Sequence, residues 1–456
     1  AIGRAIVRIP VSAGSRSASF KVAVVALLTL VLLIPLGMIR NVIADRQTNA
    51  AAAALDIRNL WGGDQTVTGP VLKLPYEVKD ETVYGLSYVD ERFVYLLAEQ
   101  LFVKADVATE VRYRGMHKVP VYSSNIIING RIDFAVLESL GISVDQIRWP
   151  GAELFIGLSD PTVLSKKPVV TVDAGEVSFA TGGNGIDGLA SQLSAALGRV
   201  LNASQAQVPL KFEVSLAFNG SGSLQFLPLA ENAEIMMSAN WSSPSFTGRQ
   251  LPALREIRDD GFEATWHSTR IGRQLPPVWI RTEDIRSFAT QSAFGARFLQ
   301  TVSLYQVTER STKYAVLIVG LTFVAYFLME IVANLKLHPL QYLLVGLANT
   351  LFYLLLLSLS EHVGFDVAYI LSAAASTTLI AGYSSAILQR RVRAFLMVAV
   401  LTALYAFLYL TLKAENLALL AGSIGLWIAL AVVMYLTRGI NWYADGDADQ
   451  KQAIEA

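Results

Sequence analysis

The residue types that could do chemistry are few in this chain, and their spacing does not fit a catalytic or metal-binding pattern. The chain has no cysteine, and its histidines are His117, His267, His338 and His362. No two of them have the spacing of a zinc motif, and a thiolate site is excluded without cysteine. The sequence also lacks a G-x-S-x-G elbow, although a serine and a base assembled only by folding would leave no such motif. We therefore expect no metal, no cofactor and no enzymatic activity.

Gly183–Gly188 matches the G-x-G-x-x-G pattern that can hold dinucleotide phosphates. It follows the strand-like stretch Val177–Ala180 and precedes the helix-like stretch Gly188–Leu201. A dinucleotide site also needs a βαβ unit and an acid about 20 residues further on, to hold the ribose. That place is taken by Val208, and Glu213 already belongs to a predicted strand. The pattern therefore favours a glycine-rich loop.

Glu330 lies within a long apolar stretch, where an ionisable group costs ~2.5 kcal/mol or more at membrane depth. Such a residue often marks a polar pathway or a helix partner. Lys336 follows about 9 Å further along a helix, so the carboxylate could instead reach the membrane interface. Pro339 fits the first position of the next helix, where its missing N–H has no cost. We expect His338 and Gln341 to cap this helix or to face Glu330.

Two other groups of side chains are candidates for a binding role. Glu361, His362 and Asp366 lie close together between two apolar segments, where they could dock a partner or simply be solvated. An aromatic group could form a groove for a peptide or a glycan, or could pack in the core of a sheet. Its members are Trp241, Phe246, Phe262 and Trp266.

Five long apolar segments follow one another between Tyr314 and Tyr443. Each has the ~20 residues that a helix with a rise of 1.5 Å per residue needs to cross ~30 Å of hydrocarbon. A core helix of a soluble protein would carry a polar face, which these segments lack. They are Tyr314–Leu335, Pro339–Leu359, Phe365–Leu388, Ala394–Leu412 and Leu417–Leu436. We predict a five-helix transmembrane bundle.

Val22–Ile39 is a further uncharged apolar run. A cleaved signal peptide is the rival interpretation, with small residues at Ala50–Ala52 as its site. The run is longer than the ~7–15 residues of a signal h-region, so an uncleaved anchor is favoured. Because Arg and Lys collect in cytoplasmic loops, the basic residues before this anchor and those at Arg390–Arg393 fix the orientation. Six spans then place both termini in the cytoplasm.

This topology leaves a large domain, residues 41–313, on the outer side of the membrane. Asn41–Leu60 is alanine-rich and predicts a helical stalk, and Val107–Arg114 and Lys211–Asn219 alternate with a period of two. Such alternation predicts strands with one buried face, so we expect an antiparallel β-sandwich. The sequence also predicts hairpins at Asn219–Gly222 and Asp259–Gly261, helices at Gly188–Leu201 and Thr282–Arg297, and a boundary near Asn184–Ala206 if there are two sandwiches.

The predicted organisation has five parts. They are a basic cytoplasmic N-terminus 1–21, a transmembrane helix 22–40, a periplasmic β-rich domain with its stalk 41–313, the bundle 314–443 and an acidic cytoplasmic tail 444–456. The 37 basic and 37 acidic residues balance over the whole chain. We expect a lipid bilayer around the chain and no nucleic-acid partner.

Several stretches together resemble the CreD family of bacterial inner-membrane proteins, also called cell envelope integrity proteins. In the membrane part they are Thr308–Ala315, Leu337–Leu347, Leu359–Phe365 and Thr437–Tyr443. In the outer domain they are Thr68–Pro70, Arg112–Gly115, Val119–Tyr122, Asn240–Trp241, Pro244–Phe246, Leu251–Pro252, Arg255, Gly261–Phe262, Ala264 and Trp266. Thr301–Ser303 and Met116–His117 depart from the family pattern. The resemblance implies a role in envelope integrity and stress responses, and it supplies no catalytic residues.

Three functions are compatible with these observations. The leading hypothesis is a non-enzymatic envelope protein whose periplasmic domain binds a periplasmic or inner-membrane partner, with homo-oligomers as a further option. A transporter or channel is the second, although secondary carriers usually show repeated halves and broken helices. The third is a hydrolase or transferase acting on envelope glycans or lipids, which would require paired carboxylates or a serine–base pair in one cleft.

Overall fold

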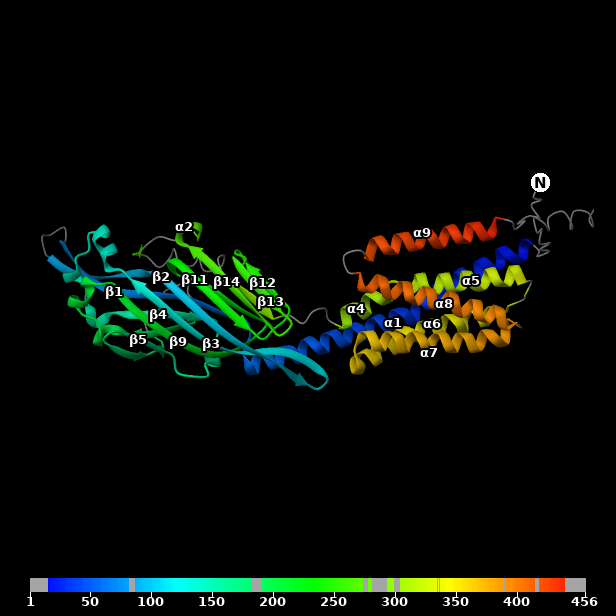
Figure 1. Cartoon of the computed structure of the whole chain (residues 1–456), viewed down its shortest axis with the longest axis horizontal. Helices are drawn as coiled ribbons and strands as arrows, with labels where there is room; N and C mark the ends of the chain where they lie inside the picture. Colours follow the sequence, from blue (N-terminus) through cyan, green and yellow to red (C-terminus); the bar gives the residue numbers. More distant parts are fainter. Residues whose placement is uncertain are drawn as a thin grey trace, which may run out of the picture. The chain divides into compact units, whose positions relative to one another are not determined.

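The computed structural model describes residues 15–81, 87–182, 191–273, 278–280, 293–298, 304–333, 335, 337–388, 390–414 and 418–438. The Gly183–Gly188 pattern therefore lies outside the described residues. The chain divides into two compact units, one formed by residues 1–50 and 302–456 and the other by residues 51–301. The helix α1, Ser15–Trp61, contributes residues to both units. Figure 1 colours the chain from its N-terminus to its C-terminus.

The first unit is a bundle of helices. Besides α1 it holds α4 (Leu304–Lys313), α5 (Ala315–Ala333), α6 (Pro339–Val363), α7 (Phe365–Ile387), α8 (Arg391–Lys413) and α9 (Ala418–Thr437). Five of the described helices are long and apolar enough to cross a membrane, and the pair α4 and α5, bent by 41°, makes a sixth span if it is counted as one. The prediction of an N-terminal span and a C-terminal cluster of apolar helices is confirmed.

Polar side chains mark the helix ends of this bundle. His338 is the N-cap of α6, because its ring accepts a hydrogen bond from the N–H of Leu340 at 3.2 Å. The side-chain oxygen of Gln341 in turn accepts a hydrogen bond from the N–H of His338 at 3.0 Å. The two bonds form a capping box around Pro339. The predicted cap is therefore present. At the other end of α6, Gly364 has a φ of +81°, which favours glycine between α6 and α7.

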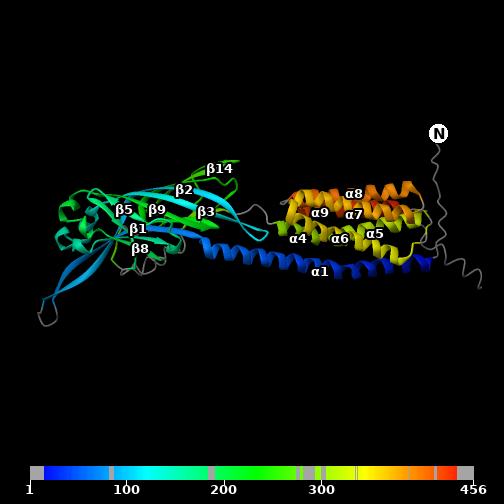
Figure 2. The ribbon, with the colours of Figure 1, turned by 90° about the horizontal axis from the view of Figure 1, so that it is seen from below.

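The second unit is a β-rich domain with one connected sheet. Its longest strands are β1 (Gln65–Glu81), β2 (Ser87–Arg114), β3 (His117–Ile132) and β9 (Leu210–Ser221). The others are β4 (Glu153–Leu158), β5 (Val169–Val172), β6 (Gly175–Ser178), β7 (Ala180–Thr181), β8 (Gln192–Ala196), β10 (Ser223–Pro228), β11 (Ala230–Ala239), β12 (Pro244–Gly248), β13 (Leu254–Arg258), β14 (Gly261–Thr269), β15 (Val278–Trp279) and β16 (Phe294–Phe298). Figure 2 shows β2, β3 and β9 running beside one another.

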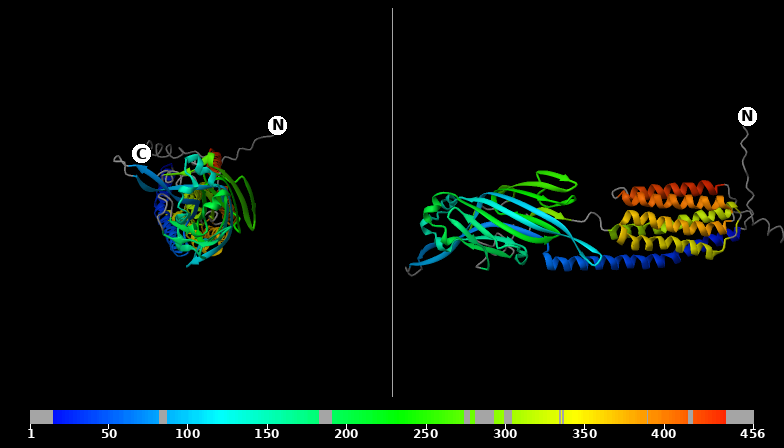
Figure 3. Two further views of the ribbon diagram at one scale, coloured as in Figure 1. Left: turned by 90° about the vertical axis from the view of Figure 1, so that its left-hand side faces the viewer. Right: turned by 60° about the horizontal axis from the view of Figure 1, so that its bottom comes forward.

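Strand β2 is long enough to join two layers of the sheet. Its first part, Ser87–Leu97, pairs antiparallel with β1, and its second part, Gln100–Arg114, pairs antiparallel with β3. Strand β11 lies parallel to that second part. The long hairpin of β2 and β3 is drawn in cyan in Figure 3. The sheet consequently folds over on itself and is nearly closed. The β-rich domain is confirmed, but the expected antiparallel pairing is incomplete, because β1 pairs parallel with β10 and β2 pairs parallel with β11.

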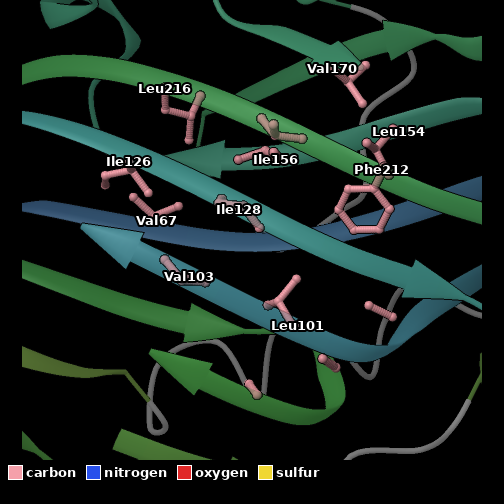
Figure 4. Packing of buried hydrophobic residues seen from close by; sticks show 14 of the residues in the cluster. Val67, Leu101, Val103, Ile126, Ile128, Leu154, Ile156, Val170, Phe212 and Leu216 are labelled. Atoms are coloured by element: carbon pink, nitrogen blue, oxygen red, sulfur yellow. The ribbon is translucent and has the colours of Figure 1, made fainter. Parts of the chain in front are cut away.

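The main hydrophobic core lies between the layers. Side chains of β1 and β4, such as Val67 and Ile156, meet side chains of β3 and β9, such as Ile128 and Phe212 (Figure 4). Ring contacts also cross the core, since Tyr122 of β3 lies 5.1 Å from Phe298 of β16 between centroids. Described residues on both sides of 184–206 belong to this core, and residues 51–301 form one compact unit.

Two local predictions were wrong. Gly188–Leu201 has apolar residues at helical spacing, yet its described part contains β8, in which Leu193 and Ala195 are buried alternately and pair with β4. Pairing with a neighbouring strand overrides helix propensity there. Most of the helix predicted at Thr282–Arg297 lies outside the described residues, and its last residues belong to β16. The turn at Asn219–Gly222 makes no hairpin, because β10 pairs with β1 and β16, whereas the hairpin at Asp259–Gly261 is confirmed.

Candidate functional site

Glu330 lies near the end of α5 with only 3% of its surface exposed. One carboxylate oxygen, Oε1, accepts the N–H of Leu337 at 3.0 Å and pairs with the ammonium of Lys21 in α1. The other, Oε2, accepts the hydroxyl of Tyr342 in α6 at 2.8 Å. The carboxylate thus joins α1, α5 and α6 at one end of the bundle. Burial of this acid is supported because both of its oxygens are bonded.

Aromatic rings pack beside the Tyr342 partner of this ion pair. The ring of Tyr342 packs edge-on against Phe323 at 5.8 Å and against Tyr326 at 6.1 Å. The hydroxyl of Tyr326 bonds to the hydroxyl of Ser384 in α7. Polar groups of four helices therefore collect at this end, in an otherwise apolar environment that strengthens electrostatic interactions.

His338 and Gln341 do not contribute to the Glu330 cluster. Among the described residues no hydrogen bond joins either side chain to the carboxylate, because both are used in the capping box of α6. The Glu330 carboxylate is bonded instead to Lys21, Leu337 and Tyr342. Lys21 was missed because it lies 309 residues away in the chain, whereas Leu337 and Tyr342 lie only 7 and 12 residues away.

The opposite end of the bundle holds two separate ion pairs instead of one cluster. Glu361 accepts the hydroxyl of Tyr305 at 3.2 Å and lies 3.8 Å from Nε of Arg46 in α1. Asp366 pairs with Lys413 at 2.7 Å, which ties α7 to α8. The ring of His362 is exposed and lies 3.0 Å from the carbonyl oxygen of Ser358. Glu361 and Asp366 each connect neighbouring helices through these contacts.

A third polar group lies inside the bundle. The hydroxyl of Tyr405 donates to Oδ1 of Asn349 at 2.9 Å, and the hydroxyl of Tyr369 donates to the carbonyl oxygen of Tyr405 at 2.7 Å. Within the described part of the chain, Nδ2 of Asn349 and the hydroxyl of Tyr353 have no hydrogen-bond partner. Helices α6, α7 and α8 therefore share a buried polar layer.

In the β-rich unit the aromatic candidates are part of the core. Trp266 is fully buried and packs against Phe246 at 5.7 Å between ring centroids, and Phe262 packs against the same ring at the same distance. Trp241 is partly buried and donates its indole N–H to the carbonyl oxygen of Ser243 at 3.1 Å. The interpretation as a binding groove is thus replaced by core packing. Arg255 lies exposed on β13, opposite Ala264 in β14.

An open groove of about 780 Å³ lies on the outer face of the sheet in the β-rich unit. It crosses β9, β3, β2, β11 and β14. At its centre the ring of Phe102 is 38% exposed, and its cross-strand neighbours are Asn129 and Glu234. Glu234 also lies opposite His267, whose Nδ1 is 3.9 Å from its carboxylate. The sequence signal for this face was the alternation of buried and exposed residues along each strand.

Amide side chains border the exposed aromatic ring. Gln100 and Asn232 form the next row across β2 and β11, where Arg131 of β3 is also present. Arg131 is held in place by two bonds of 2.7 Å from Nη2 to the carboxylate of Glu99. Amides offer donors and acceptors without net charge, and an aromatic face offers an apolar platform. The groove can therefore bind an extended polar chain.

Comparison with known proteins identifies the family. The family described as inner membrane protein CreD matches residues 17–443. The chain belongs to the CreD family. The inner membrane protein CreD of Escherichia coli strain K12 is 33% identical over 423 residues, which cover 91% of each chain. The crystal structure of an M1 zinc metallopeptidase from Deinococcus radiodurans is 9% identical, covers 37% of this chain and 38% of its own, and has a TM-score of 0.18.

Membership in CreD places this chain among inner-membrane proteins, which agrees with its apolar helices. The stretches that resemble CreD coincide with structural junctions. Leu337–Leu347 supplies the N-cap of α6 and the Tyr342 hydroxyl, and Leu359–Phe365 supplies Glu361. Thr308–Ala315 covers the bend between α4 and α5. These three stretches therefore lie at helix ends and supply interhelical bonds.

Proposed function

We propose that this protein is a non-enzymatic inner-membrane protein that supports envelope integrity and stress responses, with its β-rich unit binding an envelope partner in the periplasm. The groove across β9, β3, β2, β11 and β14 is the observation that carries this proposal. It is open along the sheet face, as a polymer requires, and differs from the enclosed, mostly apolar pockets that hold small molecules. We infer that the partner is an extended polar chain, a glycan or a peptide.

The placement in the periplasm rests on charge. Basic residues before the first span and in the Arg390–Arg393 loop fall on one side of the membrane when six spans are counted. The connection from α1 into β1 and the return into α4 then fall on the other side. The periplasm of a bacterium contains the glycan strands and peptides that such a groove would meet.

The groove supports binding better than catalysis. The ionisable residues among its described lining are Arg131, Lys211, Glu234 and His267, and the side chains of Glu234 and His267 lie 3.9 Å apart and are both widely exposed. Acid–base catalysis is usually supported by a site that excludes water, which an open sheet face does not provide. Among the described residues no group of three or more metal-ligating side chains occurs. A binding role therefore fits the geometry best.

A photo-crosslinking experiment in living cells tests this proposal. A photoreactive phenylalanine analogue is placed at Phe102 in the full chain, and the captured material is identified by mass spectrometry. The matched control carries the same analogue at Tyr113, which is 65% exposed near the end of the β2–β3 hairpin and away from the groove. We expect a defined envelope component from position 102 only.

Groove variants provide the second arm of the test. Phe102→Ala combined with Asn129→Ala should reduce capture from a neighbouring probe at Asn232, whereas Tyr113→Ala should leave that capture unchanged. Equal capture from both probe positions, or no capture at Phe102, would refute the binding role of the groove. Exposed strand residues usually change stability by less than about 0.5 kcal/mol, so the variants should remain folded.

A further inference from the structure

The bundle carries a groove of about 550 Å³ along the helices α5, α8 and α9. Every described residue that lines it is apolar or glycine, and Leu328, Val400 and Ile428 represent the three helices. These lining side chains offer no polar group that could hold water. At hydrocarbon depth an apolar groove of this kind is complementary to an acyl chain.

Helix α9 approaches α8 closely at Gly425. A Cβ atom built on Gly425 would lie 2.2 Å from Cζ of Phe407, so the ring of α8 needs glycine there. The window of α9 that could span the membrane has no buried residue. From the Gly425–Phe407 contact the groove extends to Leu396 near the start of α8 and Leu436 near the end of α9.

Arginines gather at that end of the groove. Arg393 lies one helical turn before Leu396, Arg391 lies at the first position of α8, and Arg438 lies two residues after Leu436. Arg391 and Arg438 are exposed. The guanidinium of Arg438 lies 4.0 Å from the centroid of the Tyr435 ring, and Nη1 of Arg393 donates to the carbonyl oxygen of Leu388 at 3.2 Å. These bonds leave further N–H donors on each guanidinium.

The buried acid at this end cannot neutralise the arginines, because Glu330 is already bonded to Lys21, Leu337 and Tyr342. A planar guanidinium binds phosphate oxygens through two parallel N–H bonds. Basic pockets between membrane helices recognise anionic head groups by this chemistry. The cationic end and the apolar groove are therefore two parts of one binding surface.

We propose that this surface binds an anionic phospholipid, with its head-group phosphate at Arg391, Arg393 and Arg438 and one acyl chain between α5, α8 and α9. A second copy of the chain is disfavoured as occupant. In a twofold dimer the same patch faces itself, so the arginines of the two copies would approach one another at the same membrane depth. The charge pattern favours an anionic lipid.

Lipid retention by the purified full chain tests the head-group part. The protein in mild detergent is incubated with phosphatidylglycerol or phosphatidylcholine, and bound lipid is measured by native mass spectrometry. We expect phosphatidylglycerol to be retained in preference. A basic residue near an anionic head group contributes about fivefold in affinity, so Arg391→Gln with Arg393→Gln should weaken binding about 25-fold. Lys313→Gln, a matched change at the other end of the bundle, should leave binding unchanged.

A pair of alanine substitutions tests the acyl-chain part. Ala403 lines the groove and Ala399 lies on the same helix outside it. Ala403→Phe should fill the groove and abolish selective retention, whereas Ala399→Phe should retain it. Size-exclusion chromatography and circular dichroism serve to check that both variants are folded.

Three results would overturn the proposal. The first is equal retention of phosphatidylcholine and phosphatidylglycerol. The second is unchanged binding in the arginine and Ala403→Phe variants. The third is disulfide crosslinking of two copies through Val432→Cys, which would assign the groove to a dimer. The outcome is independent of the periplasmic groove, because capture at Phe102 is measured separately.

Discussion

The carboxylate of Glu330 bonds to three parts of the chain, and this explains how one acid is retained inside an apolar helix. A buried charge is costly when it is unpaired, and its removal leaves the partner charge in the same low dielectric. Lys21 keeps 35% of its side-chain surface exposed, so water offsets part of that cost. The pair therefore has a structural role that can be measured.

Glu330→Gln should lower the unfolding free energy by about 1–3 kcal/mol, because Lys21 then lacks its counter-charge. Thermal unfolding of the full chain in micelles, followed by circular dichroism, measures this change. The double variant Lys21→Met with Glu330→Met removes both charges and should recover part of the lost stability. A double variant that is less stable than Glu330→Gln would contradict the ion-pair role.

The burial of Lys73 in β1 predicts that the unfolding free energy of the β-rich unit depends on pH. Its side chain is 5% exposed and its ammonium lies 4.2 Å from the centroid of the Phe93 ring. Burial lowers the pKa of Lys73, and the carboxylates of Glu153 and Glu91 oppose this shift. Since the folded pKa lies below the unfolded value of ~10.4, the unfolded chain binds more protons between the two.

The unfolding free energy should therefore rise as the pH rises through the lowered pKa of Lys73 toward about pH 10.4. Lys73→Met removes this group, and the variant should show a smaller rise over the same alkaline range. Unfolding midpoints of the full chain at several alkaline pH values provide the measurement. The exposed Lys104→Met on β2 serves as the control and should keep the wild-type slope. An identical slope in the Lys73 variant would contradict this assignment.

At the scale of elements, the last turns of α1 are held against β3 within the β-rich unit. Ile57 packs against Val119 and Val121 of β3. The indole N–H of Trp61 donates to the carbonyl oxygen of Tyr122 at 3.2 Å, and the guanidinium of Arg112 lies 3.8 Å from the Trp61 ring centroid. The helix ends at a residue whose side chain fixes it to the sheet.

Trp61→Ala should release this end of α1. Loss of a partly buried indole and its hydrogen bond should cost about 2 kcal/mol in local stability. Hydrogen exchange of peptides covering residues 51–61 should become faster in the full chain. Leu60→Ala is the matched control, since Leu60 is 79% exposed. Unchanged exchange in Trp61→Ala would mean that α1 is held by other contacts.

Elements were predictable where the periodicity was strong. The apolar segments predicted the membrane helices, because a run of ~20 apolar residues is rare outside membrane-spanning helices. Period-two alternation predicted β9 and part of β2, because only a strand alternates its side chains between two faces. The strands β8 and β16 were missed, since short strands of small and mixed residues take their form from neighbours such as β4 and β10.

The candidate sites were less predictable than the elements. The cap formed by His338 and Gln341 depends on residues three apart, so the sequence contained it. The pairing of Glu330 with Lys21, and the placing of Asn232 beside Gln100, depend on contacts between distant segments. No local pattern records such pairing. The aromatic candidates for a binding groove are core residues. Alternation along a strand shows that its two faces differ, but it does not distinguish a buried face from a binding face.

At the scale of the whole molecule, the remaining prediction is the orientation in the membrane. The absence of cysteine gives a native background in which one introduced cysteine is the only thiol. Lys104 and Ser215 lie exposed on the β-rich unit, whereas Arg390 lies in the loop before α8. If the positive-inside rule sets the topology, these positions face opposite sides of the inner membrane.

A membrane-impermeant maleimide should therefore label Lys104→Cys and Ser215→Cys in spheroplasts. Arg390→Cys should become labelled only after the membrane is opened. Neutralising Arg390 alone should not invert the chain, because orientation depends on the sum of basic residues in several cytoplasmic segments. Val363→Cys, at the exposed end of α6 away from Glu330, adds a position that should be labelled with the β-rich unit. Labelling of Arg390→Cys in intact spheroplasts would mean that the chain has the opposite orientation. The β-rich unit would then lie in the cytoplasm, and the proposed periplasmic partner would be refuted.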